Sequence, residues 1–148
     1  MKIAKALKMK NQLAGEVAQL KDLLAKQNSR STKQKFDYDN REVLTRLRAK
    51  LDELVKVKTA VAAANVEIYD RIFRLAELKG LATTLNALDT KTGVFHEGRG
   101  FAEASYEVEY VAQLGKVDVD KLVAELNAEI QSLQDALDEF NFTRSVNL

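Results

Sequence analysis

Three absences narrow the class of protein before any motif is considered. The 148 residues contain no cysteine, which excludes a disulfide framework and is typical of a reducing compartment. Proline is also absent, and strong helix formers such as Ala, Leu, Lys and Glu dominate. No uncharged apolar run approaches the roughly 20 residues of a membrane span, and the first residues lack the apolar core of a secretory signal. We therefore expect a helical, cytoplasmic protein.

The clearest positive signal lies in the last part of the chain. Apolar residues recur there at alternating spacings of four and three, and Asp and Glu fill the outer positions. This spacing is typical of the seam of a helix that packs against other helices, and it predicts a helix over 118–141 with Asp118 as N-cap. The seam consists of Val119, Val123, Leu126, Ile130, Leu133, Leu137 and Phe140.

Three further helices are predicted upstream, at 2–27, 41–64 and 68–88. Lys10 is the one misfit on the first seam; it either extends out of the helical stack or reaches a ligand or carboxylate. Gly80 costs its helix about 1 kcal/mol relative to Ala, which is typical of a close crossing. The apolar stripes are Ile3, Ala6, Leu13, Val17, Leu20 and Leu24 in the first helix, Leu44, Leu47, Leu51, Leu54 and Val61 in the second, and Ile72, Leu75, Leu78, Leu81 and Leu85 in the third.

Local signals place the boundaries of these helices. Residues 28–38 are rich in turn formers and lack periodicity, so they are predicted to form a loop. Asp39 precedes Glu42 by three residues, the spacing of a capping box with Asp39 as N-cap. Asn65 extends the apolar spacing but is also a frequent cap, and we predict a short break at 65–67.

The helical pattern fails over 89–117, which holds four of the six glycines. Within it, Tyr106, Val108 and Tyr110 alternate with other residues, which is typical of a strand. A lone strand is not stable, so it needs a hairpin partner or another subunit. The predicted fold is mainly α: one domain over 1–148, an antiparallel bundle of coiled-coil-like helices with a short β-hairpin or strand inserted before the last helix.

Charge is distributed unevenly along the chain. Residues 1–100 hold 20 basic and 12 acidic side chains, whereas residues 101–148 hold 3 and 10. The basic first helix and the acidic last helix could pair within one chain or between chains. The alternative is a basic arm that meets nucleic acid or anionic lipid. We favour pairing, because the acidic partner lies in the same chain.

The sequence shows no catalytic constellation, metal cluster or specific phosphate loop, so we predict no catalytic residue, metal ligand or cofactor. Gly93–Gly100 superficially resembles a phosphate loop, but Arg and Gly follow Gly98 where such loops carry Lys and Ser or Thr. His96 is the only histidine, and without cysteine the chain offers few metal ligands around it. We interpret His96 as a solvated loop residue.

Five residues are candidates for contacts with an anionic ligand. Arg71 and Arg74 share a helix face, and arginine pairs bind phosphates or carboxylates; surface salt bridges are the alternative. Tyr106 and Tyr110 would stack on a flat ligand or pack on the bundle. Arg99, between two glycines, can close over an anion.

Motifs at both ends of the chain resemble those of a known family. The chain opens with Met1-Lys-Ile-Ala-Lys-Ala-Leu7, similar to Met-Lys-Leu-Ala-x-Ala-Leu, and Leu133-Gln-Asp-Ala-Leu-Asp-Glu-Phe-Asn141-Phe142 is similar to Leu-Asp-x-x-Ile-Gln-x-x-Asn-Trp. Asn65 precedes an arginine-bearing helix, as in that family. The chain thus resembles the septicolysin-like family of small all-helical bacterial and phage-associated proteins. It differs at 106–110, which is acidic where the family often has a basic stretch.

Three functions follow from these patterns. The first is a non-enzymatic homo-oligomeric binding protein, because the seams offer more apolar surface than a thin bundle buries, and symmetric assembly creates pockets between subunits. Its most concrete form sequesters a small anionic or nucleotide-type signalling ligand, as phage proteins that blunt nucleotide-signalled defence do. The second is a coiled-coil scaffold that binds other proteins. The third is nucleic-acid binding through residues 1–35, which we do not expect because interleaved aromatics are lacking.

Overall fold

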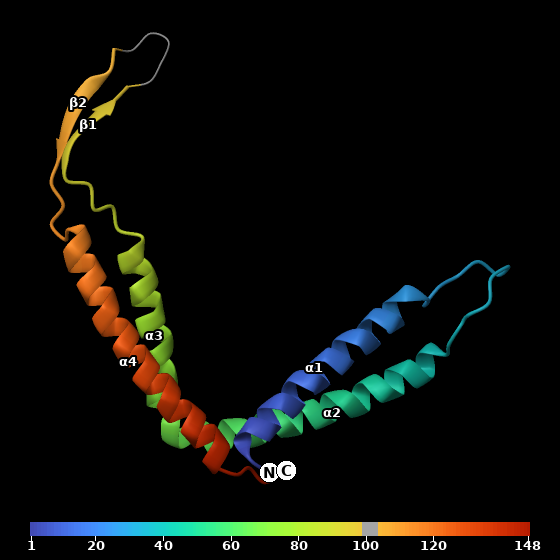
Figure 1. The fold of residues 1–148 in the computed structure, drawn as a ribbon. Coiled ribbons are helices and arrows are strands. Elements are labelled where there is room, and N and C mark those ends of the chain that lie inside the picture. Colours follow the sequence, from blue (N-terminus) through green and yellow to red (C-terminus); the bar gives the residue numbers. More distant parts are fainter. Residues whose placement is uncertain (99–103) are drawn as a thin grey trace. The chain divides into compact units, whose positions relative to one another are not determined.

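A computed structural model describes residues 1–98 and 104–148 (Figure 1). The described part is mainly helical, with one two-stranded antiparallel sheet before the last helix, which confirms the predicted fold class. None of the described helices combines the length and apolar composition that crossing a bilayer requires. In chain order the elements are α1 (Ile3–Lys26), α2 (Asn40–Ala64), the 3-10 helix η1 (Asn65–Ile68), α3 (Tyr69–Asn86), β1 (Gly93–Glu97), β2 (Tyr106–Tyr110) and α4 (Lys116–Thr143).

The single domain expected from the sequence is divided into two compact units. Unit 1 comprises Met1–Tyr69 and Leu137–Leu148, and unit 2 comprises Asp70–Ala136. The division follows the helix pairing, since α1 packs along α2 in unit 1 whereas α3 pairs with the first part of α4 in unit 2.

In unit 1, α1 and α2 form an antiparallel hairpin whose facing seams build the core (Figure 1). The seam predicted on α1 is buried except at Lys10 and Leu24, which are half-buried. The stripe predicted on α2 is wrong at its first position, because Leu44 is 45% exposed and its neighbour Val43 is buried instead. Because Val43 and Leu44 are adjacent and both apolar, the sequence alone does not decide which of them belongs to the buried stripe. The buried residues are Ile3, Ala6, Leu13, Val17 and Leu20 on α1, and Val43, Leu47, Leu54, Val57 and Val61 on α2.

The ends of α2 are set by local hydrogen bonds. Asp39 is confirmed as the N-cap, since its side chain accepts a hydrogen bond from the backbone N–H of Arg41 at 2.8 Å. At the other end, Asn65 is the C-cap, and the break predicted at 65–67 takes the form of η1. The backbone therefore tightens between α2 and α3 without leaving helical conformations.

Residues near the two ends of the chain pair with each other in unit 1. Lys2 is extended and forms an antiparallel bridge with Ser145. The N–H of Ile3, which has no partner inside α1, donates to the carbonyl of Arg144 at 3.0 Å. Val146 donates to the Met1 carbonyl at 2.7 Å, and its side chain is buried in the same core as the α1–α2 seam. The tail therefore closes one end of unit 1.

Unit 2 contains α3, the β-hairpin and the first part of α4. α3 and α4 run antiparallel, side by side (Figure 1). The predicted start of α4 is wrong by two residues, because the helix begins at Lys116 and Asp118 lies in its first turn. There the Asp118 carboxylate accepts a hydrogen bond from the N–H of Gly115 at 3.1 Å. Asp118 thus forms one half of a capping box from the N3 position, because the glycine at the N-cap has no side chain to complete the other half.

Unit 2 buries little of its apolar surface. Among its described residues, only Leu75, Ala82 and Val119 are buried. The four α4 seam residues from Val123 to Leu133 are half-buried. The close crossing predicted at Gly80 is absent from the described part of the chain, where nothing lies within 4 Å of a Cβ built at this glycine.

Candidate binding sites

The two arginines of α3 have different surroundings. Arg74 binds Glu129 of α4, with its Nη2 and Nε atoms 2.5 and 2.7 Å from Oε1. Arg71 is exposed, and its guanidinium has no partner among the described residues. Arg74 is therefore a link between the two helices of unit 2, which is the salt-bridge alternative considered from the sequence, whereas Arg71 keeps its full hydrogen-bonding capacity.

The strand register gives the β-hairpin two unlike faces. Tyr106 lies opposite Glu97, Val108 opposite Phe95 and Tyr110 opposite Gly93. Because side chains alternate along a strand, these positions share one largely aromatic face. The other face carries Val94, His96, Glu107 and Glu109.

Tyr110 already has several contacts within the hairpin. Its hydroxyl donates a hydrogen bond to the Glu97 carboxylate, and its ring meets Phe95 edge-to-face with the centroids 5.8 Å apart. The ammonium of Lys91 lies 5.0 Å from the centre of the same ring. The hydrogen bond to Glu97, together with the charge of that carboxylate, raises the pKa of Tyr110. Tyr110 therefore mainly holds the hairpin together.

Tyr106 is the more accessible tyrosine, with 54% of its surface exposed. One side of its ring covers Gly98, where a Cβ would stand 2.9 Å from the Tyr106 Cε1 atom. Gly98 also has a φ of +87°, which L-residues rarely adopt, so both conformation and space require glycine here. The ring is held at the end of the hairpin with its remaining surface toward solvent.

The structure does not bring Arg71 and Arg74 of α3 together with Tyr106 and Tyr110 within one chain. Arg74 lies in the second turn of α3, and the hairpin begins beyond the other end of that helix. The twelve residue-to-residue steps from Arg74 to Asn86 span about 18 Å at 1.5 Å per step. Arg99 lies outside the described residues. A pocket that combines these side chains therefore needs more than one subunit.

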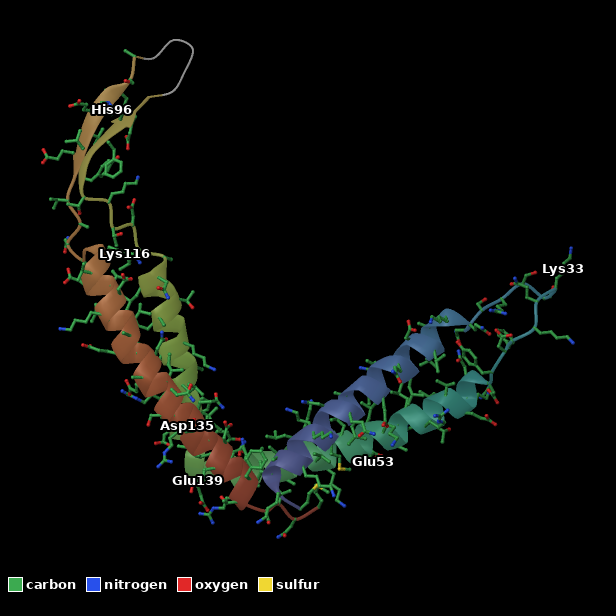
Figure 2. The ribbon with its side chains drawn as sticks, viewed as in Figure 1. Lys33, Glu53, His96, Lys116, Asp135 and Glu139 are labelled. Atoms are coloured by element: carbon green, nitrogen blue, oxygen red, sulfur yellow. The ribbon has the colours of Figure 1, made fainter. Side chains whose placement is uncertain are left out.

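Gly93 and His96 lie on the hairpin strand β1. β1 pairs with β2 and does not lead from a strand into a helix, as a phosphate loop does. Figure 2 shows His96 on β1, where its Nε2 is 3.9 Å from an Oε1 atom of Glu107 and both side chains are exposed. No group of three or more His, Asp or Glu residues that could hold a metal occurs in the described part of the chain.

The basic residues of α1 do not form an uninterrupted cationic surface. Lys5 and Lys8 line a hollow of about 440 Å³ that also contains Glu16, Lys50 and Glu53. Lys50 lies 3.1 Å from Glu16 and 3.3 Å from Glu53, and these contacts raise the pKa of the Lys50 ammonium. Two carboxylates inside the hollow disfavour a polyanion such as nucleic acid.

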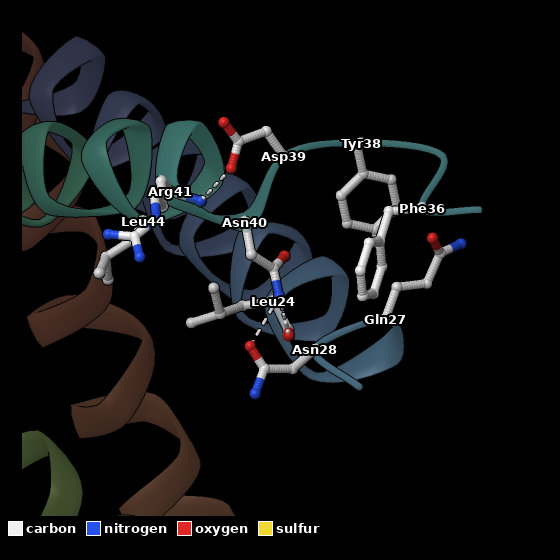
Figure 3. A pocket seen from close by; sticks show the side chains of 9 residues that line it. All are labelled: Leu24, Gln27, Asn28, Phe36, Tyr38, Asp39, Asn40, Arg41 and Leu44. Atoms are coloured by element: carbon white, nitrogen blue, oxygen red, sulfur yellow. Dashed lines mark hydrogen bonds between the residues drawn. The ribbon is translucent and has the colours of Figure 1, made fainter. Parts of the chain in front are cut away.

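A larger hollow lies where the α1–α2 connection returns to α2, and sequence reasoning missed it. We call it the tip pocket; its volume is about 800 Å³ (Figure 3). The only sequence signals were two aromatic residues in an otherwise polar loop and a Leu beside the α2 seam. Its lining includes Leu24, Asn28, Phe36, Asn40, Arg41 and Leu44.

Hydrogen bonds hold the loop that forms the tip pocket. The Tyr38 hydroxyl donates to the Leu23 carbonyl at 2.6 Å, which ties the loop to the end of α1. Gln27 and Asp37 bind each other reciprocally, through the Gln27 amide N–H and the Asp37 backbone N–H, at 2.6 and 2.9 Å. Asn40 donates to the Leu24 carbonyl at 2.9 Å. The pocket is therefore a formed feature of unit 1 and not a gap beside a loose loop.

No family model, no curated protein and no solved structure matches this chain. The resemblance to the septicolysin-like family stays a prediction.

Proposed function

We propose that the protein is a non-enzymatic, homo-oligomeric helical binding protein that sequesters a small anionic ligand of the nucleotide type. The observation that carries the oligomeric part is the α4 seam. It is the most regular apolar pattern in the sequence, yet its four residues between Val119 and Leu137 are only half-buried. On α1, by contrast, the seam residues from Ile3 to Leu20 are buried apart from Lys10.

A second apolar stripe supports the same proposal. Phe73 and Leu81 are exposed, and their spacing of eight residues places them on one side of α3, away from the buried Leu75 and Ala82. Leu88, two residues beyond the end of α3, is exposed as well. Gly80 lies beside Leu81 on this outer stripe, with open space around it. A helix of a second copy that packs here would account for the exposed apolar residues and for a glycine that nothing in the described chain requires.

The free energy of burying apolar surface, compared with the cost of association, indicates that the α4 seam and the outer stripe of α3 are both needed. Full burial of a Leu, Ile or Val side chain stabilises by about 1.5–3 kcal/mol, so covering the four half-buried seam residues contributes on the order of 4 kcal/mol. Association itself costs at least about 4 kcal/mol. The seam therefore roughly offsets the cost of association, and the outer stripe of α3 supplies the surplus.

The ligand part of the proposal is supported by Arg71 and the aromatic face of the hairpin. Arg71 is the α3 arginine without a described partner, and Tyr106 presents an exposed ring. These groups are too far apart within one chain to share a small ligand, whereas symmetry in an oligomer can place Arg71 of one subunit near the hairpin of another.

Native mass spectrometry of protein purified from cells tests this proposal, because it reports subunit number and any co-purified small molecule together. We expect a species larger than 16.6 kDa for the wild type and a monomer for Leu81→Arg, which places a charge on the outer stripe. Leu81 is 46% exposed, so the substitution should leave the fold intact, as circular dichroism would show. Ser132→Arg, on an exposed part of α4, is the matched control and should stay oligomeric. A wild-type monomer at micromolar concentration would contradict the proposal.

A further inference from the structure

The tip pocket, introduced above, has walls that are fixed before any ligand binds. Tyr38 holds the loop to α1, Gln27 is paired with the loop, and Asp39 caps α2. These polar groups already form hydrogen bonds within the chain. The recognition chemistry of the pocket therefore depends on the side chains that line it and remain unpaired.

Three of these lining side chains keep free hydrogen-bonding capacity within the described structure. The Arg41 guanidinium has no hydrogen-bond or ion-pair partner there. Asn28 accepts a hydrogen bond on its Oδ1 at 3.2 Å, which leaves its amide N–H groups unpaired. Asn40 donates through Nδ2, but its Oδ1 is buried without a partner and points toward the Phe36 side of the pocket (Figure 3). An unpaired buried acceptor is unfavourable, and a ligand N–H that reaches it removes that cost.

Phe36 gives the pocket a flat apolar surface. It is 56% exposed, although it belongs to a loop whose other residues are mostly polar. Leu24 and Leu44 provide further apolar lining. A nucleobase fits this combination, because it has a π-face for an aromatic ring and both N–H groups and acceptors on its edge for the amides.

Charge determines which group accompanies the base. Residues 24–44 carry five basic and three acidic side chains, and the Asp39 carboxylate is already used as the cap. An arginine guanidinium without a partner binds phosphate through two hydrogen bonds and repels an ammonium group. A volume of about 800 Å³ lies within the usual range for small-molecule sites.

We propose that the tip pocket binds a mononucleotide, with its base against Phe36, the edge of the base at Asn28 and Asn40, and its phosphate on Arg41. The class of ligand rests on the function proposed above. The location differs, because all of these contacts come from a single chain and none comes from Arg71, Tyr106 or Tyr110.

Nitrogen-15 NMR titration with AMP, adenosine and ribose 5-phosphate tests the site. We expect AMP to shift amide signals within residues 24–44 and to bind more tightly than either fragment, because each fragment lacks one of the two main contacts. Arg41→Ala should weaken AMP binding about 10- to 150-fold, the usual effect of losing a charge-assisted hydrogen bond. Phe36→Ala should weaken it about 5- to 150-fold through loss of stacking, and Phe36→Tyr should retain it. Both residues are exposed, so the fold should persist.

The fragments and one control variant separate the possible failures. Phe36→Ala should leave ribose 5-phosphate binding unchanged, whereas Arg41→Ala should reduce it. Arg46→Ala, at an exposed arginine of α2 that does not line the pocket, is the control and should not alter AMP affinity. If Arg71→Ala weakens AMP binding and Arg41→Ala does not, the tip pocket is the wrong site while the proposed function stands. If millimolar AMP shifts no signal, the present inference is overturned, and the mass measurement described above still decides whether the protein self-associates.

Discussion

At the scale of single residues, the candidate contacts are distinguished by whether their polar atoms already have partners. Arg74 and Tyr110 resemble ligand-binding residues in the sequence, but Arg74 is bound to Glu129 and the Tyr110 hydroxyl to Glu97. Arg71 and Arg41 have no such partner among the described residues. An unused guanidinium can bind an anion without first breaking a hydrogen bond, and these two arginines are therefore the ones to mutate first.

The Tyr110–Glu97 hydrogen bond has a consequence that titration can measure. Because the folded hairpin raises the pKa of Tyr110, the protonated phenol is the stabilised form. Its contribution is fully present below the ordinary tyrosine pKa and is lost as pH rises through the raised value. Glu97→Gln removes the charged acceptor, so Tyr110 should ionise at lower pH, followed through its ring carbon signals in NMR spectra.

A matched control for that titration lies on the other face of the hairpin. Glu107→Gln makes the same change of charge, but Glu107 faces His96 and not Tyr110. The Tyr110 titration should be unaltered in this variant. An equal shift in both variants would mean that general charge, and not the hydrogen bond, sets the pKa.

At the scale of secondary structure, the sequence predicts the existence and type of each element better than its contacts. The regular seams and the Asp39 cap predicted the ends of the helices to within two or three residues of the observed ends, because both signals are local. The choice of Val43 over Leu44 and the role of Asp118 depend on how neighbouring segments meet, which spacing alone does not specify. The tip pocket was not predicted because its shape depends on hydrogen bonds between α1 and a loop without periodicity.

Two glycines should respond in opposite ways to the same substitution. Gly15 lies inside α1 with nothing within 4 Å of a built Cβ, so Gly15→Ala should raise the free energy of unfolding by about 1 kcal/mol through helix propensity alone. Thermal unfolding followed by circular dichroism would measure this increase. Gly98→Ala should instead disrupt the hairpin, because the new Cβ would meet the Tyr106 ring at a positive φ. NMR contacts between Glu97 and Tyr106 would be lost. A destabilised Gly15→Ala variant would show that α1 has a neighbour at this position.

At the scale of the whole molecule, the two units differ in how much core they possess. Unit 1 has a continuous core formed by α1, α2 and the tail, whereas unit 2 depends on three buried residues in its described part and a two-stranded hairpin. A hairpin of two strands is marginal in water, and a pair of helices with a half-exposed seam is little better. In the proposed oligomer, unit 2 is therefore where a second copy would contribute most to stability.

Thermal stability should consequently depend on protein concentration. If folding is coupled to association, each tenfold increase in concentration favours a dimer by about 1.4 kcal/mol, and the unfolding midpoint rises. Scanning calorimetry of the wild type over a hundredfold concentration range would show this rise, and Leu81→Arg should remove it. A midpoint that stays constant for the wild type would contradict coupled association.

The pairing of the tail with the start of α1 also constrains the order in which the chain can fold during synthesis. The α1–α2 hairpin joins neighbouring segments and can form as soon as residue 64 has left the ribosome. The partners of Met1 and Ile3, by contrast, are Val146 and Arg144, which are translated last among these residues. Because domains fold progressively from the N-terminus, the α1–α2 hairpin forms before the tail is available. One end of its core therefore stays uncovered while unit 2 is translated. Ribosome-stalled chains that end before residue 144 should therefore retain the hairpin but remain more sensitive to proteases at the start of α1 than the released protein.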